Sequence, residues 1–283
     1  MLAPAKINLD LLITGRRDDG YHLLDSIVVF TELCDELTVE KSDQLSLTIS
    51  GPFANDLSNR NDNLILEAAR LICEECGVEP NLKFHLIKNL PISSGIGGGS
   101  ADAAVAIKLT IQQLNLSISK GRLEAIALRL GADVPVCLRS ISTHMKGIGE
   151  GLSPLNLSRP FDILLVNPGV SVSTPRIFNE YKKSEKIFDR PRKEKISNIN
   201  DRFIKEEVLN SKNALEGVAC RIEPQIQKIL NVLENFEGLW LGRMSGSGAT
   251  CFGIFNNEEN CLKAKKYLKA NHSKWWIEST KSL

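Results

Sequence analysis

A cluster of glycines in the middle of the chain could bind an anion through its backbone. Four of the five residues 95–99 are glycine, and Ser100 and a long apolar run follow them. Glycine lets the backbone approach a ligand closely and adopt positive φ angles. A helix that starts directly after such a loop points unpaired N–H groups and the positive end of its dipole at the ligand. With Ser100 as the N-cap and Asp102 in the first turn, the pattern predicts a phosphate-binding loop at a helix start.

This loop does not match the two common phosphate-binding motifs. The chain contains no Gly-Lys-Ser/Thr, so it has no Walker A sequence. The spacing Gly95-x-Gly97-x-x-Ser100 has serine where the dinucleotide fingerprint has its third glycine. Taken alone, the loop could also be a glycine-rich turn that packs against a sheet.

Other segments carry polar side chains that could take part in the same chemistry. A strand expected over the first thirteen residues places Lys6 and Asn8 on one face. Asp133 follows a helix-ending glycine and precedes a proline, and a buried carboxylate there would need a partner. Tyr21 and His22 open a strand after a turn, where an aromatic ring could stack on a base. Taken singly, these residues could also belong to a solvated strand edge, a stabilised turn or ordinary packing.

Composition narrows the class of protein. The 283 residues suit two modest domains or one large one, and the contents of 42% hydrophobic and 24% charged residues are typical of globular proteins. The net charge of +1, from 35 basic and 34 acidic residues, argues against nucleic acid or a membrane surface as the main partner. No apolar run reaches the ~20 residues of a spanning helix, and no signal-peptide core is evident. We therefore expect a cytoplasmic protein; monomeric and oligomeric forms both stay open.

The seven cysteines indicate free thiols rather than a metal site. Cys73 and Cys76 form a single CxxC inside an apolar helical pattern, and a zinc site would need a second pair. We expect these two to be helix cysteines that pack in the interior, as is typical of a reducing compartment.

The elements that must hold these residues are strands and helices in mixed order. The charged residues 182–206 favour a solvated helix or a surface segment, and residues 147–151 look like a connection between two halves. A second glycine-rich loop spans residues 244–250. We expect strands at residues 2–13, 21–30, 35–41, 44–50, 82–88, 161–167, 251–255 and 275–280, and helices at 64–76, 100–114, 123–130, from about 175, 206–219, 224–235 and 257–270.

Three separated motifs occur together in this chain. They are PAKINLDL near the start, PISSGIGGGSADAA in the middle and GRMSGSGATCFG near the end, and the segments DGYHLLDSI, GADVPVCL and GIGEGLSPL lie between them. This ordered set resembles the GHMP kinase superfamily of small-molecule kinases. One departure is Ser93-Ser94, where members more usually have two still smaller residues.

The resemblance implies a fold and an activity. It implies an α+β fold with an ATP-binding domain over residues 1–150, a substrate-side domain over 151–283, and an active site in the cleft between them. It also implies transfer of a phosphoryl group from ATP to an alcohol of a small molecule, with Mg²⁺. Ser100 and Asp133 are candidate Mg²⁺ ligands.

The resemblance assigns roles by position. Asp133 matches the catalytic base and Lys6 its basic neighbour. Tyr21 and His22 match residues that hold a cytosine ring, and Phe178 matches a second aromatic at the same ring. The ATP-binding positions are Pro91, Ser93, Ser94, Gly95, Ile96, Gly97, Gly98, Gly99 and Ser100, with Asn61 or Asn63 near the adenine; the substrate-side positions are Asn8, Tyr21, His22, Lys88, Asp133, Thr174, Phe178, Ser245 and Gly246.

Alternatives to this interpretation are a kinase of the same superfamily with a mevalonate-like or amino-alcohol substrate, a nucleotide-binding module without catalysis, and an RNA-binding α+β domain. The segments DGYH and GADVP argue against the first alternative. The presence of both Lys6 and Asp133 argues against the second, and the near-neutral charge argues against the third.

Overall fold

The chain forms two compact units, and neither is a continuous stretch of sequence. The chain passes from one unit to the other at five places. The computed structural model describes residues 1–55, 57, 63–184, 187–193 and 196–283. Unit 1 consists of Met1–Ala5, Leu33–Ile92 and Gly97–Ser140, and unit 2 of Lys6–Glu32, Ser93–Ile96 and Ile141–Leu283. The division at residue 150 expected from the sequence stays a prediction.

In unit 1, a small sheet presents one apolar face. Strand β5 (Leu82–Ile87) pairs parallel with β4 (Ser46–Ser50) and antiparallel with the second half of β3 (His22–Lys41), with Leu86 opposite Leu37. Residues of β5 alternate between buried and partly exposed positions, as expected for a strand with one covered face. The first strand, β1 (Leu2–Asn8), begins in this unit.

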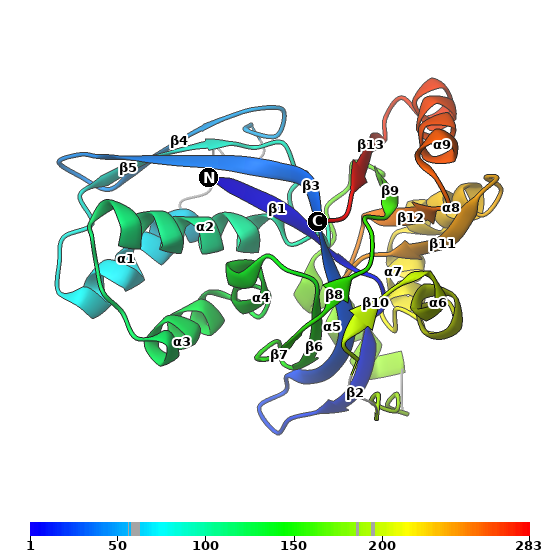
Figure 1. The fold of residues 1–283 in the computed structure, drawn as a ribbon, viewed down its shortest axis with the longest axis horizontal. Coiled ribbons are helices and arrows are strands. Elements are labelled where there is room, and N and C mark those ends of the chain that lie inside the picture. The colour runs from blue at the N-terminus through cyan, green and yellow to red at the C-terminus, as the bar shows by residue number, and fades with distance from the viewer. Residues whose placement is uncertain (56, 58–62, 185–186, 194–195) are drawn as a thin grey trace. The chain divides into compact units, whose positions relative to one another are not determined.

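Helices cover that sheet on one side, as Figure 1 shows. Helix α1 (Leu64–Cys76) occupies the range predicted from the sequence; Asn63 caps its start and Gly77, in the left-handed conformation, ends it. Helix α2 (Gly98–Gln113) packs against α1 through buried alanines, which allow a close approach. Helices α3 (Lys120–Leu130) and α4 (Val134–Arg139) complete unit 1.

Unit 2 contains an antiparallel sheet of four strands in the order β11-β12-β9-β13. Helices α8 and α9 pack on it, and α7 packs on α8, so that the apolar residues of β9 and β12 lie in a core with Ile229 and Leu268. These elements are β9 (Asp162–Asn167), β11 (Leu239–Met244), β12 (Cys251–Phe255), β13 (Trp276–Lys281), α7 (Glu216–Ile222), α8 (Pro224–Leu233) and α9 (Glu258–Asn271).

A second group of strands in unit 2 is built around the first half of β3. Strand β2 (Leu12–Arg16) forms a hairpin with it, and β6 (Thr143–Gly147) pairs on its other side. Residues 147–151, expected as a connection between halves, form the turn between β6 and β7 (Gly151–Pro154). The remaining elements are β8 (Asn156–Leu157), α5 (Thr174–Ser184), β10 (Asn198–Ile199), α6 (Asp201–Phe203) and the π-helix η1 (Ile204–Val208).

Two strand predictions need correction. The pieces expected at 21–30 and 35–41 belong to one strand of 20 residues, β3, because neither glycine nor proline interrupts it. The strand expected over residues 2–13 is divided into β1 and β2. It breaks at Asp10, whose side chain accepts a hydrogen bond from the N–H of Ile27 and whose carbonyl accepts one from Ser26.

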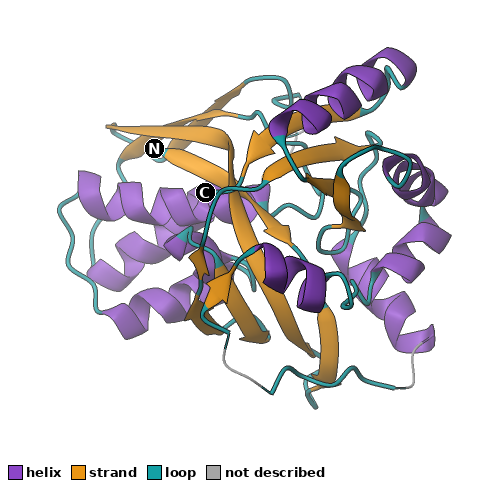
Figure 2. Ribbon diagram, turned by 45° about the vertical axis from the view of Figure 1, so that its right-hand side comes forward, coloured by secondary structure: helices purple, strands orange, loops and turns teal. Residues whose placement is uncertain are grey.

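Both units combine helices and strands, as Figure 2 shows, which confirms the expected α+β class. Among the described residues, no helix is both long enough and apolar enough to cross a membrane.

Candidate active site

The glycine-rich loop leads into a helix, as predicted, but the N-cap lies three residues earlier than expected. Gly97, at φ 66°, occupies the N-cap position and α2 begins at Gly98. Ser100 therefore lies inside the first turn and is not the cap, and Asp102 lies beyond that turn, buried. A glycine cap brings no side chain to the helix end, so the first N–H groups of this 16-residue helix keep their capacity to bind an anion.

Residues 93–96, the part of the loop that belongs to unit 2, are hydrogen-bonded to the second glycine-rich loop of the same unit. The Ser245 hydroxyl donates to the carbonyl of Gly95 at 3.0 Å, and the N–H of Thr250 donates to the carbonyl of Ser94 at 3.0 Å. A Cβ atom on Gly95, which has φ +76°, would lie 2.4 Å from the Ser245 carbonyl oxygen. Only glycine therefore fits at this crossing of two backbones.

The Asn213 side chain holds the second glycine-rich loop in place through hydrogen bonds. This role was not predicted from the sequence. Its side-chain amide donates to the carbonyls of Met244 and Gly246, each at 2.8 Å, and its oxygen accepts from the N–H of Leu215. The residue is buried. No local pattern marks this role of Asn213, because the two loop carbonyls that it binds lie more than thirty residues away in sequence.

Asn8 contributes an unsatisfied acceptor to this region. Its backbone N–H donates to the Ser245 hydroxyl at 3.1 Å and its side-chain amide donates to the Ser26 hydroxyl at 2.8 Å. Its Oδ1 is buried and accepts no hydrogen bond from the described residues. A buried acceptor without a donor is costly, so Oδ1 is suited to a donor supplied by a ligand. Lys6 is likewise buried, which excludes a solvated strand edge for this pair.

Asp133 belongs to unit 1, whereas Lys6 belongs to unit 2, so their pairing stays a prediction. Asp133 occupies the N-cap position of α4 and is partly exposed. In the described part of the chain its side chain accepts no capping hydrogen bond from α4.

Two of the residues expected near the substrate, His22 and Phe178, lie together in unit 2. The rings of His22 and Phe178 stack with their centroids 5.2 Å apart, and Tyr181 meets His22 edge-on at 5.9 Å. Tyr181 was not predicted, although its spacing from Ile177 on α5 is that of a buried helix face. Burial and the nearby cations Arg16 and Lys182 lower the pKa of His22. At neutral pH the ring is therefore uncharged and can both donate and accept a hydrogen bond.

The remaining predicted site residues differ in exposure and in hydrogen-bond partners. Tyr21 is 59% exposed, and the hydroxyls of Thr174 and Ser247 are hydrogen-bonded at 2.8 Å. Lys88 is buried between two carboxylates of unit 1 rather than open to a ligand. Asn63 caps α1 by accepting from the N–H of Ile65. Asn61 lies outside the described residues.

The described residues contain no group of three or more histidine, cysteine, aspartate or glutamate side chains that could hold a metal ion. Ser100 and Asp133, both in unit 1 and both partly exposed, offer oxygen donors of the kind that Mg²⁺ prefers. Such a small donor set suits a cation that is held mainly by phosphate oxygens and water.

Family models match both halves of the chain. The family described as GHMP kinases N terminal domain matches residues 63–140, and the family described as GHMP kinases C terminal matches residues 199–274. The first match contains the glycine-rich loop together with α2 and Asp133, and the second contains Asn213 and the second glycine-rich loop.

Curated proteins and solved structures agree with these matches. The 4-diphosphocytidyl-2-C-methyl-D-erythritol kinase of Ruegeria pomeroyi is 44% identical over 97% of this chain and 95% of its own length. Its counterpart in Paramagnetospirillum magneticum is 40% identical over the same shares. A crystal structure of 4-(cytidine 5'-diphospho)-2C-methyl-D-erythritol kinase superimposes with a TM-score of 0.75 at 31% identity, covering 100% of this chain and 99% of that one. The mevalonate kinase of L. major, at a TM-score of 0.69 and 14% identity over 99% of this chain and 94% of that one, shares the fold. The chain therefore belongs to the GHMP kinases and, among them, to the family of the 4-diphosphocytidyl-2-C-methyl-D-erythritol kinases.

Proposed function

We propose that this protein transfers the γ-phosphoryl group of ATP to the 2-hydroxyl of 4-diphosphocytidyl-2-C-methyl-D-erythritol, a step in the non-mevalonate route to isoprenoid precursors. The observation that carries this proposal is the 44% identity to a kinase of that name over 97% of the chain. The glycine-rich loop at the start of α2 and the aromatic group around His22 support it, because the first suits phosphates and the second suits a pyrimidine ring.

Phosphoryl transfer depends mainly on positioning and on stabilisation of charge. The N–H groups of Gly98, Gly99 and Ser100 at the start of α2 bind the phosphates of ATP. Mg²⁺, when bound, neutralises phosphate charge, with Ser100 and Asp133 as its candidate protein ligands. Residues 91–97 shape the remainder of the nucleotide site.

The acceptor hydroxyl needs a base, because an alcohol is a poor nucleophile. Asp133 is the proposed base, and Lys6 is proposed to keep that carboxylate ionised and to orient the hydroxyl. Asn8 Oδ1, which is buried and has no donor among the described residues, is proposed to accept a hydrogen bond from the substrate.

The cytosine ring is proposed to bind beside Tyr21, His22 and Phe178. Each aromatic face that stacks on a base contributes about 1–3 kcal/mol, and the neutral imidazole of His22 can read a polar edge of the ring. Thr174, Ser245 and Gly246 are proposed to line the same side. The seven free cysteines fit a reducing compartment, and the cytoplasm is part of this proposal.

One experiment tests the proposal directly. Mg²⁺-dependent release of ADP is measured with 4-diphosphocytidyl-2-C-methyl-D-erythritol, with mevalonate and with homoserine. We expect turnover with the first compound and background rates with the other two. Preferential turnover of mevalonate or homoserine would favour another GHMP kinase activity, and no turnover with any acceptor would favour a nucleotide-binding module.

A further inference from the structure

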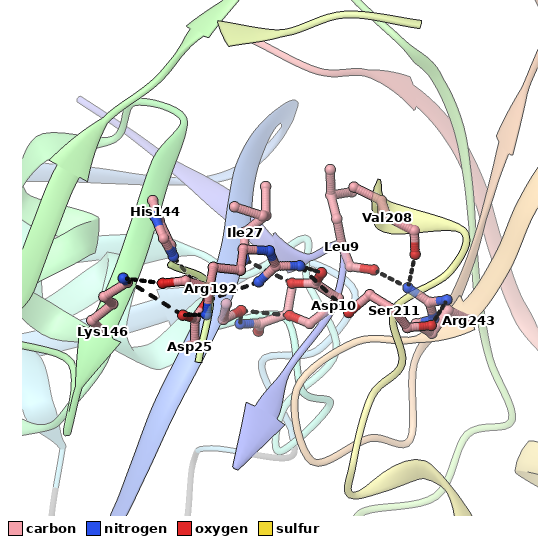
Figure 3. A network of polar contacts seen from close by, with 12 residues as sticks. Leu9, Asp10, Asp25, Ile27, His144, Lys146, Arg192, Val208, Ser211 and Arg243 are labelled. Carbon is pink, nitrogen blue, oxygen red and sulfur yellow. Dashed lines mark hydrogen bonds and ion pairs between the residues drawn. The ribbon is translucent and has the colours of Figure 1, made fainter. Parts of the chain in front are cut away.

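Unit 2 contains a buried network of charged side chains that the proposed chemistry does not use (Figure 3). At its centre the Arg192 guanidinium contacts two carboxylates that are fully buried, those of Asp10 and Asp25. One guanidinium nitrogen donates to Asp25 at 2.7 Å, and the backbone N–H of Arg192 donates to the other oxygen of Asp25 at 2.9 Å. A buried carboxylate is stable only when it is paired, and Arg192 is the cation that the two carboxylates share.

Strand β6 supplies the rest of the network. His144 Nε2 lies 2.8 Å from Asp25, and the ammonium of Lys146 lies 3.7 Å from the same carboxylate. Lys146 also donates to the backbone carbonyl of Arg192 at 3.2 Å. The turn at residues 147–151 begins directly after Lys146 and joins β6 to β7. His144 and Lys146, two members of the network, lie on β6.

The network is linked along the chain to the two elements that carry the aromatic group. Asp25 follows His22 by three residues on β3, and Arg192 lies in the segment after α5, the helix that carries Phe178. The same segment is joined to β2: the backbone N–H of Asp189 donates to the carbonyl of Ile13 at 2.8 Å, and the Asp189 carboxylate accepts from the N–H of Ile13 at 3.0 Å. His22 is thus carried by β3, which Arg192 contacts through Asp25, and Phe178 by α5, the helix that precedes the segment of Arg192 in the chain.

We infer that Arg192 is a positioning residue for cytidine recognition: it fixes residues 187–193, which follow α5 in the chain, to β3 and so keeps Phe178 against His22. This inference rests on the proposed function. It also gives the surface segment 182–206 a role that its charge pattern did not indicate, because the Arg192 side chain is only 11% exposed.

The predicted effect is selective. Without Arg192 the segment after α5 is released from Asp10 and Asp25, and Phe178 loses its fixed distance from His22. Misplacement of a binding group by about 1 Å can cost as much as ~10²-fold in rate or affinity. The ATP phosphates are proposed to bind at α2, which belongs to unit 1, so binding of ATP should change little.

The test compares Arg192→Met with Arg190→Met, which removes an exposed arginine from the same segment. We expect Arg192→Met to raise KM for 4-diphosphocytidyl-2-C-methyl-D-erythritol at least about 10-fold, with KM for ATP within twofold of wild type. Arg190→Met should leave both values unchanged. Arg192→Lys, which can satisfy one carboxylate but not hold both, should fall between Arg192→Met and the wild type.

A second variant keeps the test valid if Arg192→Met folds poorly. In Asp10→Asn/Arg192→Met one buried carboxylate is removed with its cation, while the amide oxygen of the new residue can still accept from Ile27 and Asp25 keeps His144. The same selective rise in KM is expected. Equal changes in both KM values, or a lowered melting temperature with unchanged KM, would overturn the inference. A wild-type protein that does not turn over the cytidine substrate would instead overturn the proposed function.

Discussion

The ammonium of Lys88 lies 2.6 Å from a carboxylate oxygen of Asp102, and both side chains are buried in unit 1. A second carboxylate, that of Asp35, lies 2.5 Å from the same nitrogen. Burial and the charge of Asp35 raise the pKa of Asp102 to about 7, although Lys88 acts in the opposite direction. A Cβ atom on Gly98, at the start of α2, would lie 3.2 Å from the Lys88 nitrogen. The buried cluster of Lys88, Asp35 and Asp102 therefore packs against the start of α2, the helix that is proposed to bind phosphate.

Lys88→Met should strongly destabilise the protein. It removes the cation between two buried carboxylates, and breaking a buried ion pair in this way costs about 3–5 kcal/mol in the free energy of unfolding. Urea denaturation at pH 7 measures the change. Lys83→Met is the matched control, because Lys83 lies on β5 and forms an exposed pair with Glu40, which should contribute less than about 1 kcal/mol. Similar losses in both variants would contradict the structural role of Lys88.

Gly95→Ala should weaken both the stability of the protein and its binding of ATP, because the added methyl group causes a steric clash in addition to the strain of a positive φ. The added methyl group would lie 2.4 Å from the Ser245 carbonyl oxygen and 2.8 Å from backbone atoms of Gly248. Gly77→Ala is the control, because Gly77 also has a positive φ, 66°, but nothing lies within 4 Å of its Cβ position. Melting temperature and KM for ATP are measured for both. For Gly95→Ala we expect a lower melting temperature and a higher KM for ATP. For Gly77→Ala we expect only a loss of about 1–2 kcal/mol in the free energy of unfolding.

Acid should weaken unit 2 through Asp25. Burial alone would raise its pKa, but hydrogen bonds from His144 and Arg192 lower it from 3.8 to about 2. Because the folded-state pKa is the lower one, the stabilisation is present above pH ~4 and is lost as the pH falls toward ~2; the shift corresponds to about 2.5 kcal/mol. Urea denaturation from pH 5 to pH 2.5 should show a shallower decline for Asp25→Asn than for wild type. The exposed replacement Asp43→Asn should keep the wild-type slope.

Asp133→Asn should reduce kcat at least ~10²-fold, because the amide cannot accept the proton of the substrate hydroxyl. Lys6→Met, which keeps the apolar part of the side chain, should reduce kcat to a similar degree. ADP release gives the rates, and circular dichroism checks that both variants fold. Turnover close to that of wild type in either variant would contradict its assigned role.

Cytidine nucleotides should compete with the substrate more effectively than uridine nucleotides. CMP and UMP differ only in the pyrimidine edge, which His22 is proposed to read, so the inhibition constants of the two should differ in favour of CMP. Phe178→Ala should weaken inhibition by CMP through the loss of one stacking face. Equal inhibition by CMP and UMP would refute a pocket that recognises cytosine.

Local signals predicted the elements that carry strong caps and clear periodicity. Helix α1 was predicted residue for residue, since Asn63, an apolar 3.6-residue pattern and Gly77 all mark it. The start of α2 was misplaced because Ser100 looks like a cap in sequence, whereas a glycine ends the loop.

The positions that hold the candidate site together could not be read from local sequence. Arg192 meets Asp10 at a separation of 182 residues, and no short window contains both. In a mixed-charge stretch, a buried arginine has the same appearance as an exposed one. The ordered motifs identified the family, but they did not indicate Asn213 or Arg192.

The division of the chain between the two units has a consequence for synthesis on the ribosome. All segments of unit 1 precede residue 141, so that unit can fold while the rest of the chain is still being made. Strand β2 and the first half of β3, which belong to unit 2, are synthesised early. Asp10 and Asp25 can pair with Arg192 only after more than 160 further residues have been made. During that interval both carboxylates must stay hydrated. The apolar residues beside them stay exposed, so that they can bind chaperones or form non-native contacts. Folding of unit 2 is therefore expected to be the slow, late step in making this protein.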